Sequence, residues 1–276
     1  MGGRLRLMKA LGKPLPVVLT IAGSDSGGGA GVQADLKTFA SLDVFGTSAI
    51  TCVTAQNPSK VSRIYSIDAR MVAEQIMMIC SGFPLAAAKV GMLYSEPIIR
   101  AVAQCVSQYR IPQLVVDPVM MSSSRAQLLR PDSVSALCWE LMTKATVVTP
   151  NLVEAEVLFG RPIASIEAAK EAARDIAERF KTACVVKGGH LKPEARGKKG
   201  GKNVVDVLYV KGKIHEFKCP RVDAVETHGT GCVFSAAVTA FLARGKTLLK
   251  AVEESQRFVH DALKNSKSAG PYQVLG

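Results

Sequence analysis

Short apolar runs alternate with segments of helical periodicity along most of this chain. Residues 17–22 are continuously apolar or β-branched, which is the pattern of a strand buried on both faces of a parallel sheet. Val32, Leu36 and Phe39 then recur at the spacing of one helix face. Strands are expected at 17–22, 44–54, 88–90, 113–116, 146–149 and 183–187. Helices are expected at 32–42, 72–80, 97–109, 131–143, 164–180 and 247–264, with another that starts near 230.

Two later β-rich runs, 204–210 and 214–217, flank Lys211-Gly212-Lys213 and predict a hairpin at the edge of the sheet. Strands and helices alternate elsewhere, so we predict an α/β fold whose mostly parallel sheet carries helices on both faces. No repeat or shift of composition divides the chain. We therefore expect a basic leader at 1–15, a single domain at 16–268 and a C-terminal tail at 269–276.

Composition supports a folded protein. The 276 residues are 48% hydrophobic, which is enough for a substantial core. The longest apolar runs are far shorter than the ~20 residues that span a bilayer, and no signal-peptide pattern precedes them. We expect a soluble, cytoplasmic protein with no membrane partner. The seven cysteines are scattered and include no Cys-x-x-Cys pair, so neither a disulfide framework nor a zinc site is predicted.

The formal net charge of +12 raises the question of nucleic acid. The basic residues concentrate at 4–13 and 196–202, where few aromatic side chains are available to stack on bases. Nucleic acid is therefore not the expected partner. The charge is instead read as solvated tail and loop charge that also attracts polyphosphate substrates.

The most informative stretch is Glu226-Thr227-His228-Gly229-Thr230-Gly231-Cys232, which leads into an apolar helix. Unpaired amides and a partial positive charge at a helix start favour an anion. Cys232 lies on that first turn, where its pKa is predicted to fall below ~8.5. An anion hole beside a base suits phosphoryl transfer to a hydroxyl. The alternative is a glycine turn followed by a core cysteine.

A second glycine-rich stretch, Gly23-Ser24-Asp25-Ser26-Gly27-Gly28-Gly29-Ala30-Gly31, follows the first expected strand and permits close backbone approach to a ligand. It has neither the Walker A ending nor the Gly-x-Gly-x-x-Gly spacing. Gly245-Lys246-Thr247 is not a Walker A motif either, because Ala240 stands where that pattern requires glycine. A nucleotide site here must be built differently.

Polar residues end several of the expected strands. Gln56 offers both donors and an acceptor to an aminopyrimidine-like edge, or it caps a loop. Asp117 lies where α/β sheets bind ligands and could hold magnesium directly or through water. Asn151 and Glu154 have the spacing of a capping box, or else they organise metal-bound water. Lys187, followed by two glycines, can approach a phosphate closely.

Together these segments resemble one family, the hydroxymethylpyrimidine and phosphomethylpyrimidine kinases of thiamine biosynthesis, within the ribokinase-like superfamily. The resemblance covers about residues 17 to 265. The motifs that carry it, in the family's order, are Ala22-Gly23-Ser24-Asp25 with Gly28-Gly29-Ala30-Gly31, Gln33-Ala34-Asp35-Leu36-Lys37-Thr38, Thr54-Ala55-Gln56-Asn57, Lys89-Val90-Gly91-Met92-Leu93, Asp117-Pro118-Val119-Met120, Thr149-Pro150-Asn151 with Glu154, Lys187-Gly188-Gly189-His190 and Thr227-His228-Gly229-Thr230-Gly231-Cys232.

The resemblance implies a ribokinase-like three-layer fold and an ATP-dependent kinase that phosphorylates 4-amino-5-hydroxymethyl-2-methylpyrimidine and then its monophosphate. It implies a site in four parts. The aminopyrimidine would meet Gln56, with Gly23, Asp25, Met92 and Val119 around it. ATP phosphates and Mg²⁺ would meet Asp117, Asn151, Glu154 and Lys187, with Asp117 and Glu154 holding the metal directly or through water. Gly229, Thr230 and Gly231 would form the anion hole, and Cys232 would stand in place of the aspartate base of ribokinase-type relatives. A homodimer is also implied.

The chain departs from the family pattern at two loops. Met121-Ser122-Ser123-Ser124-Arg125 places a bulky arginine where a flexible glycine is usual, in a loop expected to close over substrate. The basic loop 191–202 is longer than usual. Two rival functions remain open: a pyridoxal or pyridoxine kinase of the same superfamily, and a non-catalytic regulator that senses a pyrimidine and binds nucleic acid through its basic segments.

Overall fold

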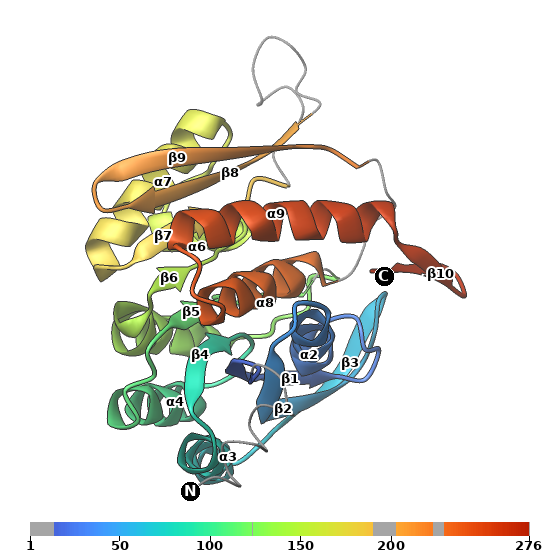
Figure 1. The fold of residues 1–276 in the computed structure, drawn as a ribbon, viewed down its shortest axis with the longest axis vertical. Helices are drawn as coiled ribbons and strands as arrows, with labels where there is room; N and C mark the ends of the chain where they lie inside the picture. The colour runs from blue at the N-terminus through green and yellow to red at the C-terminus, as the bar shows by residue number, and fades with distance from the viewer. Residues whose placement is uncertain (1–13, 123, 190–202, 223–228, 276) are drawn as a thin grey trace, which may run out of the picture.

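A computed structural model describes residues 14–122, 124–189, 203–222 and 229–275. Its main feature is a nine-stranded sheet of order β3-β2-β1-β4-β5-β6-β7-β8-β9 (Figure 1). The five strands at its centre and β2 run parallel, and β3, β8 and β9 are antiparallel to their neighbours. The bounds are β1 Val17–Asp25, β2 Phe45–Asn57, β3 Lys60–Ser66, β4 Leu85–Val90, β5 Leu114–Val116, β6 Val147–Val148, β7 Ala183–Val186, β8 Asn203–Val210 and β9 Lys213–Pro220.

Helices cover both faces of this sheet, as predicted. Helices α2 (Gly31–Ser41), α8 (Thr230–Ala243) and α9 (Leu248–Lys264) pack together over one face (Figure 1). The other face carries α3 (Ala69–Gly82), α4 (Glu96–Gln108), α5 (Val134–Ala136), α6 (Leu152–Phe159) and α7 (Ile166–Phe180). Successive residues of β1 supply the two cores, Leu19 to one and Val18 to the other, because side chains alternate across a strand. The three-layer α/β prediction is confirmed.

Three elements differ from the sequence prediction. The hairpin partner β3 was not predicted, because only Val61 and Ile64 of this edge strand join an apolar cluster and its pairing with β2 is interrupted by a bulge. The expected helix at 131–143 is instead a series of 3₁₀, α and π turns from Pro131 to Lys144. Residues beyond 266, expected as the end of the domain and a tail, form a small hairpin of β10 (Lys267–Ala269) and β11 (Tyr272–Val274).

Several further expectations can be compared with the structure. The predicted edge hairpin is present as β8 and β9. All seven cysteines are free thiols. Within the described ranges, the helices are too short or too polar to cross a bilayer. The basic loop 191–202 and residues 1–13 of the expected leader lie outside the described residues.

Candidate active site

The predicted site residues gather at the carboxyl edge of the parallel strands. Gly23 and Asp25 end β1, Gln56 lies near the end of β2, and Asp117 follows β5. Lys187 follows β7 and forms an isolated bridge with Asn151, which follows β6. The strand order places these ends side by side, which is where open α/β sheets bind ligands.

Asp25 organises the glycine-rich loop. Its buried carboxylate accepts hydrogen bonds from the backbone amides of Gly27 at 2.8 Å, Gly29 at 3.1 Å and Ala30 at 2.9 Å. These bonds fold the loop into a tight turn just before α2 begins at Gly31. Asp25 therefore shapes the site by fixing the backbone of the loop.

The glycine-rich loop touches the start of α8. Gly229 is the N-cap of α8 with φ +93°, and a Cβ at this position would lie 1.8 Å from the carbonyl oxygen of Gly29. Only glycine permits that approach. The first amides of α8, at Thr230, Gly231 and Cys232, have no acceptor within the helix. Two helices thus begin at one place, and the partial positive charge of the helix starts favours an anion there. Glu226, Thr227 and His228 lie outside the described residues.

Cys232 lies on the first turn of α8 and is half-buried. The prediction of a lowered pKa is wrong. Burial raises the pKa of the Cys232 thiol, and Asp35 and Asp117 raise it further, while Lys89 and the Gly31 amide oppose the shift. The helix start alone suggested a thiolate, but the loss of water around the sulfur outweighs that effect.

Asp117 is the centre of a polar network opposite the start of α8. Its carboxylate accepts from Lys187 Nζ at 2.8 Å, from Ser235 Oγ at 3.0 Å and from Thr149 Oγ1 at 3.3 Å. A Cβ at Gly231 would lie 3.3 Å from Lys187 Nζ, so the ammonium group sits against the first turn of α8. The ammonium of Lys187 and the first amides of α8 therefore lie close together.

Asn151 and Glu154 form the predicted capping box. The side chain of Asn151 accepts from the Glu154 amide, and the Glu154 carboxylate accepts from the Asn151 amide at 2.8 Å. Burial raises the pKa of the Glu154 carboxyl to about 7, with Lys187 opposing the shift and Asp117 adding to it. Glu154 thus caps α6 and also faces the Asp117–Lys187 pair, so the structural and functional interpretations are compatible.

The buried carboxylate of Asp206 fixes the backbone just after Lys187. Asp206 on β8 accepts from the Gly188 amide at 2.8 Å and from Gln256 Nε2 of α9, also at 2.8 Å. A Cβ at Gly188 would lie 1.9 Å from the carbonyl oxygen of Val205, so β8 packs directly against this turn. The turn that follows Lys187 is therefore held by β8, through a hydrogen bond and through close packing. Sequence inspection did not identify Asp206.

An apolar cluster lies beside the glycine-rich loop. Met92 and Val119, both predicted at the substrate pocket, belong to it; the other members are Cys52, Leu128, Val61, Ile64 and Tyr94. A Cβ at Gly23 would lie 2.8 Å from Cys52 Sγ and 3.2 Å from Met92 Sδ, so Gly23 borders this cluster. Gln56 is half-buried on the adjoining β2–β3 hairpin, where its backbone N–H donates to Ser26 Oγ of the loop at 2.9 Å. An apolar surface with a polar amide at its margin suits a small aromatic ring.

The loop after β5 is a compact turn. Met121 and Gln127 form an isolated bridge, and the Arg125 amide donates to Ser122 O at 2.9 Å. Arg125 has φ +62°, a left-handed conformation that favours glycine. The arginine thus occupies a backbone position suited to the glycine usual in the family. Ser123 lies outside the described residues.

A buried ion pair is a further feature that the sequence did not predict. Lys89 of β4 and Asp35 of α2 form a fully buried ion pair, with Nζ 2.9 Å from each carboxylate oxygen. Thr20 donates to the same carboxylate at 2.6 Å. A lysine inside an otherwise apolar strand was the available signal, but its partner is 54 residues away in sequence.

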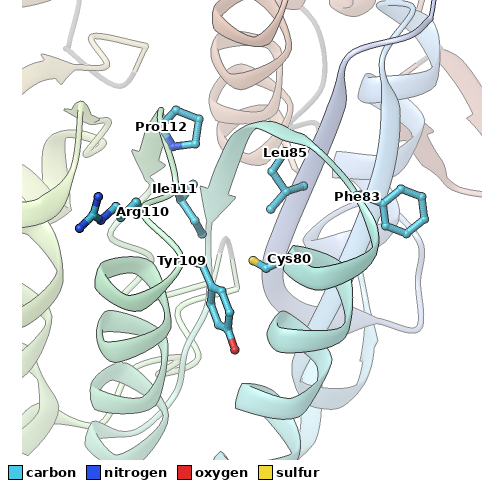
Figure 2. A pocket seen from close by; sticks show the side chains of 7 residues that line it. All are labelled: Cys80, Phe83, Leu85, Tyr109, Arg110, Ile111 and Pro112. Atoms are coloured by element: carbon cyan, nitrogen blue, oxygen red, sulfur yellow. The ribbon is translucent and has the colours of Figure 1, made fainter.

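A hollow between the ends of α3 and α4 lies at the opposite edge of the sheet. Figure 2 shows the side chains that line it, from Cys80, Phe83, Leu85, Tyr109, Arg110, Ile111 and Pro112. Leu85 begins β4 and Pro112 precedes β5, so this is the amino edge of the parallel strands. None of the candidate site residues contributes to it.

Comparisons with known proteins agree with this geometry. The family model described as phosphomethylpyrimidine kinase matches residues 25–275. A hydroxymethylpyrimidine/phosphomethylpyrimidine kinase of Bacillus subtilis is 40% identical over 252 residues, 91% of this chain and 90% of that protein. A thiamine biosynthesis bifunctional protein of Geobacter sulfurreducens is 40% identical over 93% of this chain and 51% of its own length. The pyridoxal kinase of Staphylococcus aureus, in complex with AMP-PCP and pyridoxal, superposes with a TM-score of 0.85 at 34% identity, covering 96% of this chain and 94% of that one.

Proposed function

The chain belongs to the phosphomethylpyrimidine kinase family and is a phosphotransferase, and from this premise we propose which groups of this chain transfer the γ-phosphoryl of ATP to a hydroxymethylpyrimidine of thiamine biosynthesis. The supporting observation is the convergence of the glycine-rich loop with the start of α8, where Gly229 meets Gly29 beside Cys232. The acceptor is 4-amino-5-hydroxymethyl-2-methylpyrimidine and, in a second step, its monophosphate.

In the first transfer, the acceptor hydroxyl loses its proton to Cys232 and attacks the γ-phosphorus, and the bond from that phosphorus to the β,γ-bridging oxygen breaks, which releases ADP. In the second transfer, a phosphate oxygen of the monophosphate is the nucleophile. The amides of Thr230, Gly231 and Cys232 stabilise the charge on the transferring oxygens. Loss of one such donor typically adds ~2.7–4 kcal/mol to a barrier. Lys187, held in place by its ion pair with Asp117, adds positive charge on the same side of the transferring phosphoryl group as these amides. The protein therefore acts mainly by position and electrostatics, as in other phosphoryl transfers.

Mg²⁺ is expected to accompany ATP. Within the described ranges no group of three or more His, Cys, Asp or Glu side chains forms a metal cage. Asp117 and Glu154 are both buried carboxylates; Asp117 forms an ion pair with Lys187, and Glu154 interacts electrostatically with the same lysine. This pair fits Mg²⁺, which proteins hold through one or two carboxylates plus substrate phosphates. Asp117 and Glu154 would hold the ion, which neutralises phosphate charge when bound.

Gln56 is proposed to bind the edge of the pyrimidine ring, with Met92 and Val119 against its face. Replacing Gln56 by leucine is expected to raise the KM for the pyrimidine about 10- to 100-fold, because donors and acceptors on the ring lose their partners. The KM for ATP should stay at the parent value. Initial-rate assays against each substrate measure both constants. Gln108→Leu, on the exposed surface of α4, makes the same chemical change elsewhere. An unchanged pyrimidine KM for Gln56→Leu would remove it from this role.

The structural similarity to pyridoxal kinases makes pyridoxal the alternative acceptor. A pyridine that carries a hydroxymethyl group has nearly the same shape as the hydroxymethylpyrimidine. Competition in one reaction separates the two. The purified protein is incubated with Mg-ATP and equimolar hydroxymethylpyrimidine and pyridoxal, and the phosphorylated products are measured by mass spectrometry. Pyrimidine mono- and diphosphates should dominate. Faster formation of pyridoxal phosphate would reverse the assignment, and ATP-independent binding of nucleic acid with no product would favour the regulator.

The homodimer and the cytoplasmic location are proposals that the family resemblance supports. Sedimentation of the purified protein measures the first. Neither is required by the chemistry above.

A further inference from the structure

The carboxylate of Asp206, on β8, is buried without a cation beside it. Asp206 is 5% exposed, and within the described residues no Lys, Arg or His side chain forms an ion pair with it. A carboxylate that leaves water is costly unless hydrogen bonds replace its hydration, and a well-packed apolar side chain often serves stability equally well. Stability is therefore a weak reason for an aspartate at this position.

The hydrogen bonds of Asp206 join three elements to one backbone amide. One carboxylate oxygen accepts from the Gly188 amide at 2.8 Å, and the other accepts from Gln256 Nε2 at 2.8 Å. Both partners are donors, so only a group that accepts through two oxygens satisfies them. Gln256 Nε2 of α9 also donates to the carbonyl oxygen of Phe217 on β9, at 2.9 Å. Gln256 therefore holds the carboxylate in the orientation that meets Gly188.

Gly188 directly follows Lys187, so these bonds fix the backbone on the carboxyl side of the lysine. On its amino side, the Lys187 amide donates to the carbonyl oxygen of Pro150 at 3.0 Å. A Cβ at Gly188 would lie 1.9 Å from the carbonyl oxygen of Val205, so the turn is in close contact with β8. The backbone that carries Lys187 is thus held between the segment after β6 and strand β8.

The ammonium of Lys187 depends on this backbone for its place. Its Nζ lies 2.8 Å from an Asp117 carboxylate oxygen and 3.3 Å from where a Cβ of Gly231 would be, on the first turn of α8. A shift of the turn would move the ammonium relative to the first amides of α8. Misplacing a group at a reacting centre by about 1 Å can cost ~10²-fold in rate.

We propose that Asp206, held by Gln256, is a positioning residue for phosphoryl transfer: it fixes the Gly188 amide and thereby keeps the Lys187 ammonium beside the first turn of α8. This inference rests on the proposed role of Lys187 as a positive charge beside the phosphates of ATP. It gives α9 and the antiparallel strands β8 and β9 a part in the reaction.

The test is a double-mutant cycle between Asp206 and Lys187. Asp206→Leu, Lys187→Met and the double variant are compared with the parent for kcat, and for the affinity of Mg-AMP-PCP measured by calorimetry. Each single variant should lower kcat at least about 10-fold and weaken AMP-PCP binding. The double variant should match Lys187→Met within about twofold in both quantities, because Asp206 acts through the lysine.

Gln256→Leu removes the support of the Asp206 carboxylate and should lower kcat about 3- to 10-fold. Gln75→Leu is its matched control. Gln75 of α3 also binds backbone groups, accepting from the Ile50 amide at 2.9 Å and donating to the Ile50 carbonyl at 3.1 Å, on the opposite face of the sheet from α9. It should lose thermal stability and keep the parent kcat.

If Asp206→Leu fails to fold, Asp206→Asn takes its place in the cycle, since asparagine keeps one acceptor oxygen for the two donors; it should show the same coupling with smaller losses. Single losses that multiply in the double variant would overturn the proposal, and so would parent kcat and parent AMP-PCP affinity in the Asp206 variant. AMP-PCP binding needs neither acceptor nor turnover. A parent that binds AMP-PCP but phosphorylates no pyrimidine would therefore contradict the proposed function, while the binding cycle would still decide the role of Asp206.

Discussion

Replacing Gly229 by alanine is expected to lower kcat by about 100-fold or more. The new methyl group would lie 1.8 Å from the carbonyl oxygen of Gly29, so either the glycine-rich loop or the start of α8 must shift. The start of α8 carries the amides that we propose stabilise the transferring phosphoryl group, and displacing a single donor of this kind typically costs ~10²–10³ in rate. Steady-state kinetics with the pyrimidine and ATP measure the loss.

Gly160→Ala is the matched control for this variant. Gly160 has φ +82°, close to the +93° of Gly229, but a Cβ there meets no atom within 4 Å. Both variants carry a similar backbone cost, about 1 kcal/mol. Gly160→Ala should lose a little thermal stability and keep the parent kcat. Equal activity of the two alanine variants would show that the contact between the loops is not needed for catalysis.

Replacing Cys232 by alanine is expected to reduce kcat about 10²- to 10⁴-fold, the range attributed to a positioned general base. The pH profile carries the sharper signature. A base acts in its deprotonated form, and burial raises the pKa of this thiol. The kcat/KM of the parent should therefore rise with pH through neutrality and beyond ~8.5, the ordinary value for cysteine. That rise should be absent from the residual activity of Cys232→Ala.

Cys219→Ala serves as the control, since this half-buried cysteine on β9 lies outside the site. It should keep both the parent kcat and the alkaline rise. A Cys232→Ala variant with near-parent activity, or one that retains the rise, would remove Cys232 from the role of base and leave the amides and Lys187 as the working groups.

The gathering of the candidate site residues at one edge of the sheet could be predicted because these residues follow buried strands. Apolar runs located the ends of β1, β5 and β7, and parallel strands bring such ends to one edge. Asp117 and Lys187 were therefore placed without knowledge of any contact, and the structure joins them at 2.8 Å. The Asn151–Glu154 capping box was likewise predictable, because it depends only on spacing along one chain segment.

The features that could not be predicted from the sequence depend on residues that are far apart along the chain. The pKa of Cys232 was predicted from its own helix, whereas burial of the sulfur in the folded protein raises it. Lys89 and Asp35 are unremarkable apart, and only the fold joins them. Strand β3 was not predicted because its few apolar residues pack against the small cluster around Met92 and not against either main core.

The contact between Gly29 and Gly229 can form only late in the synthesis of the chain. The two glycines are 200 positions apart, and α8 follows the last strand of the nine-stranded sheet. During synthesis, domains acquire structure from the amino terminus as the chain emerges. The sheet can therefore begin to form on the ribosome before the glycine-rich loop can meet the start of α8, where we propose that phosphate binds. A nascent chain that ends before residue 232 should bind no nucleotide productively, so turnover begins only when translation is nearly finished.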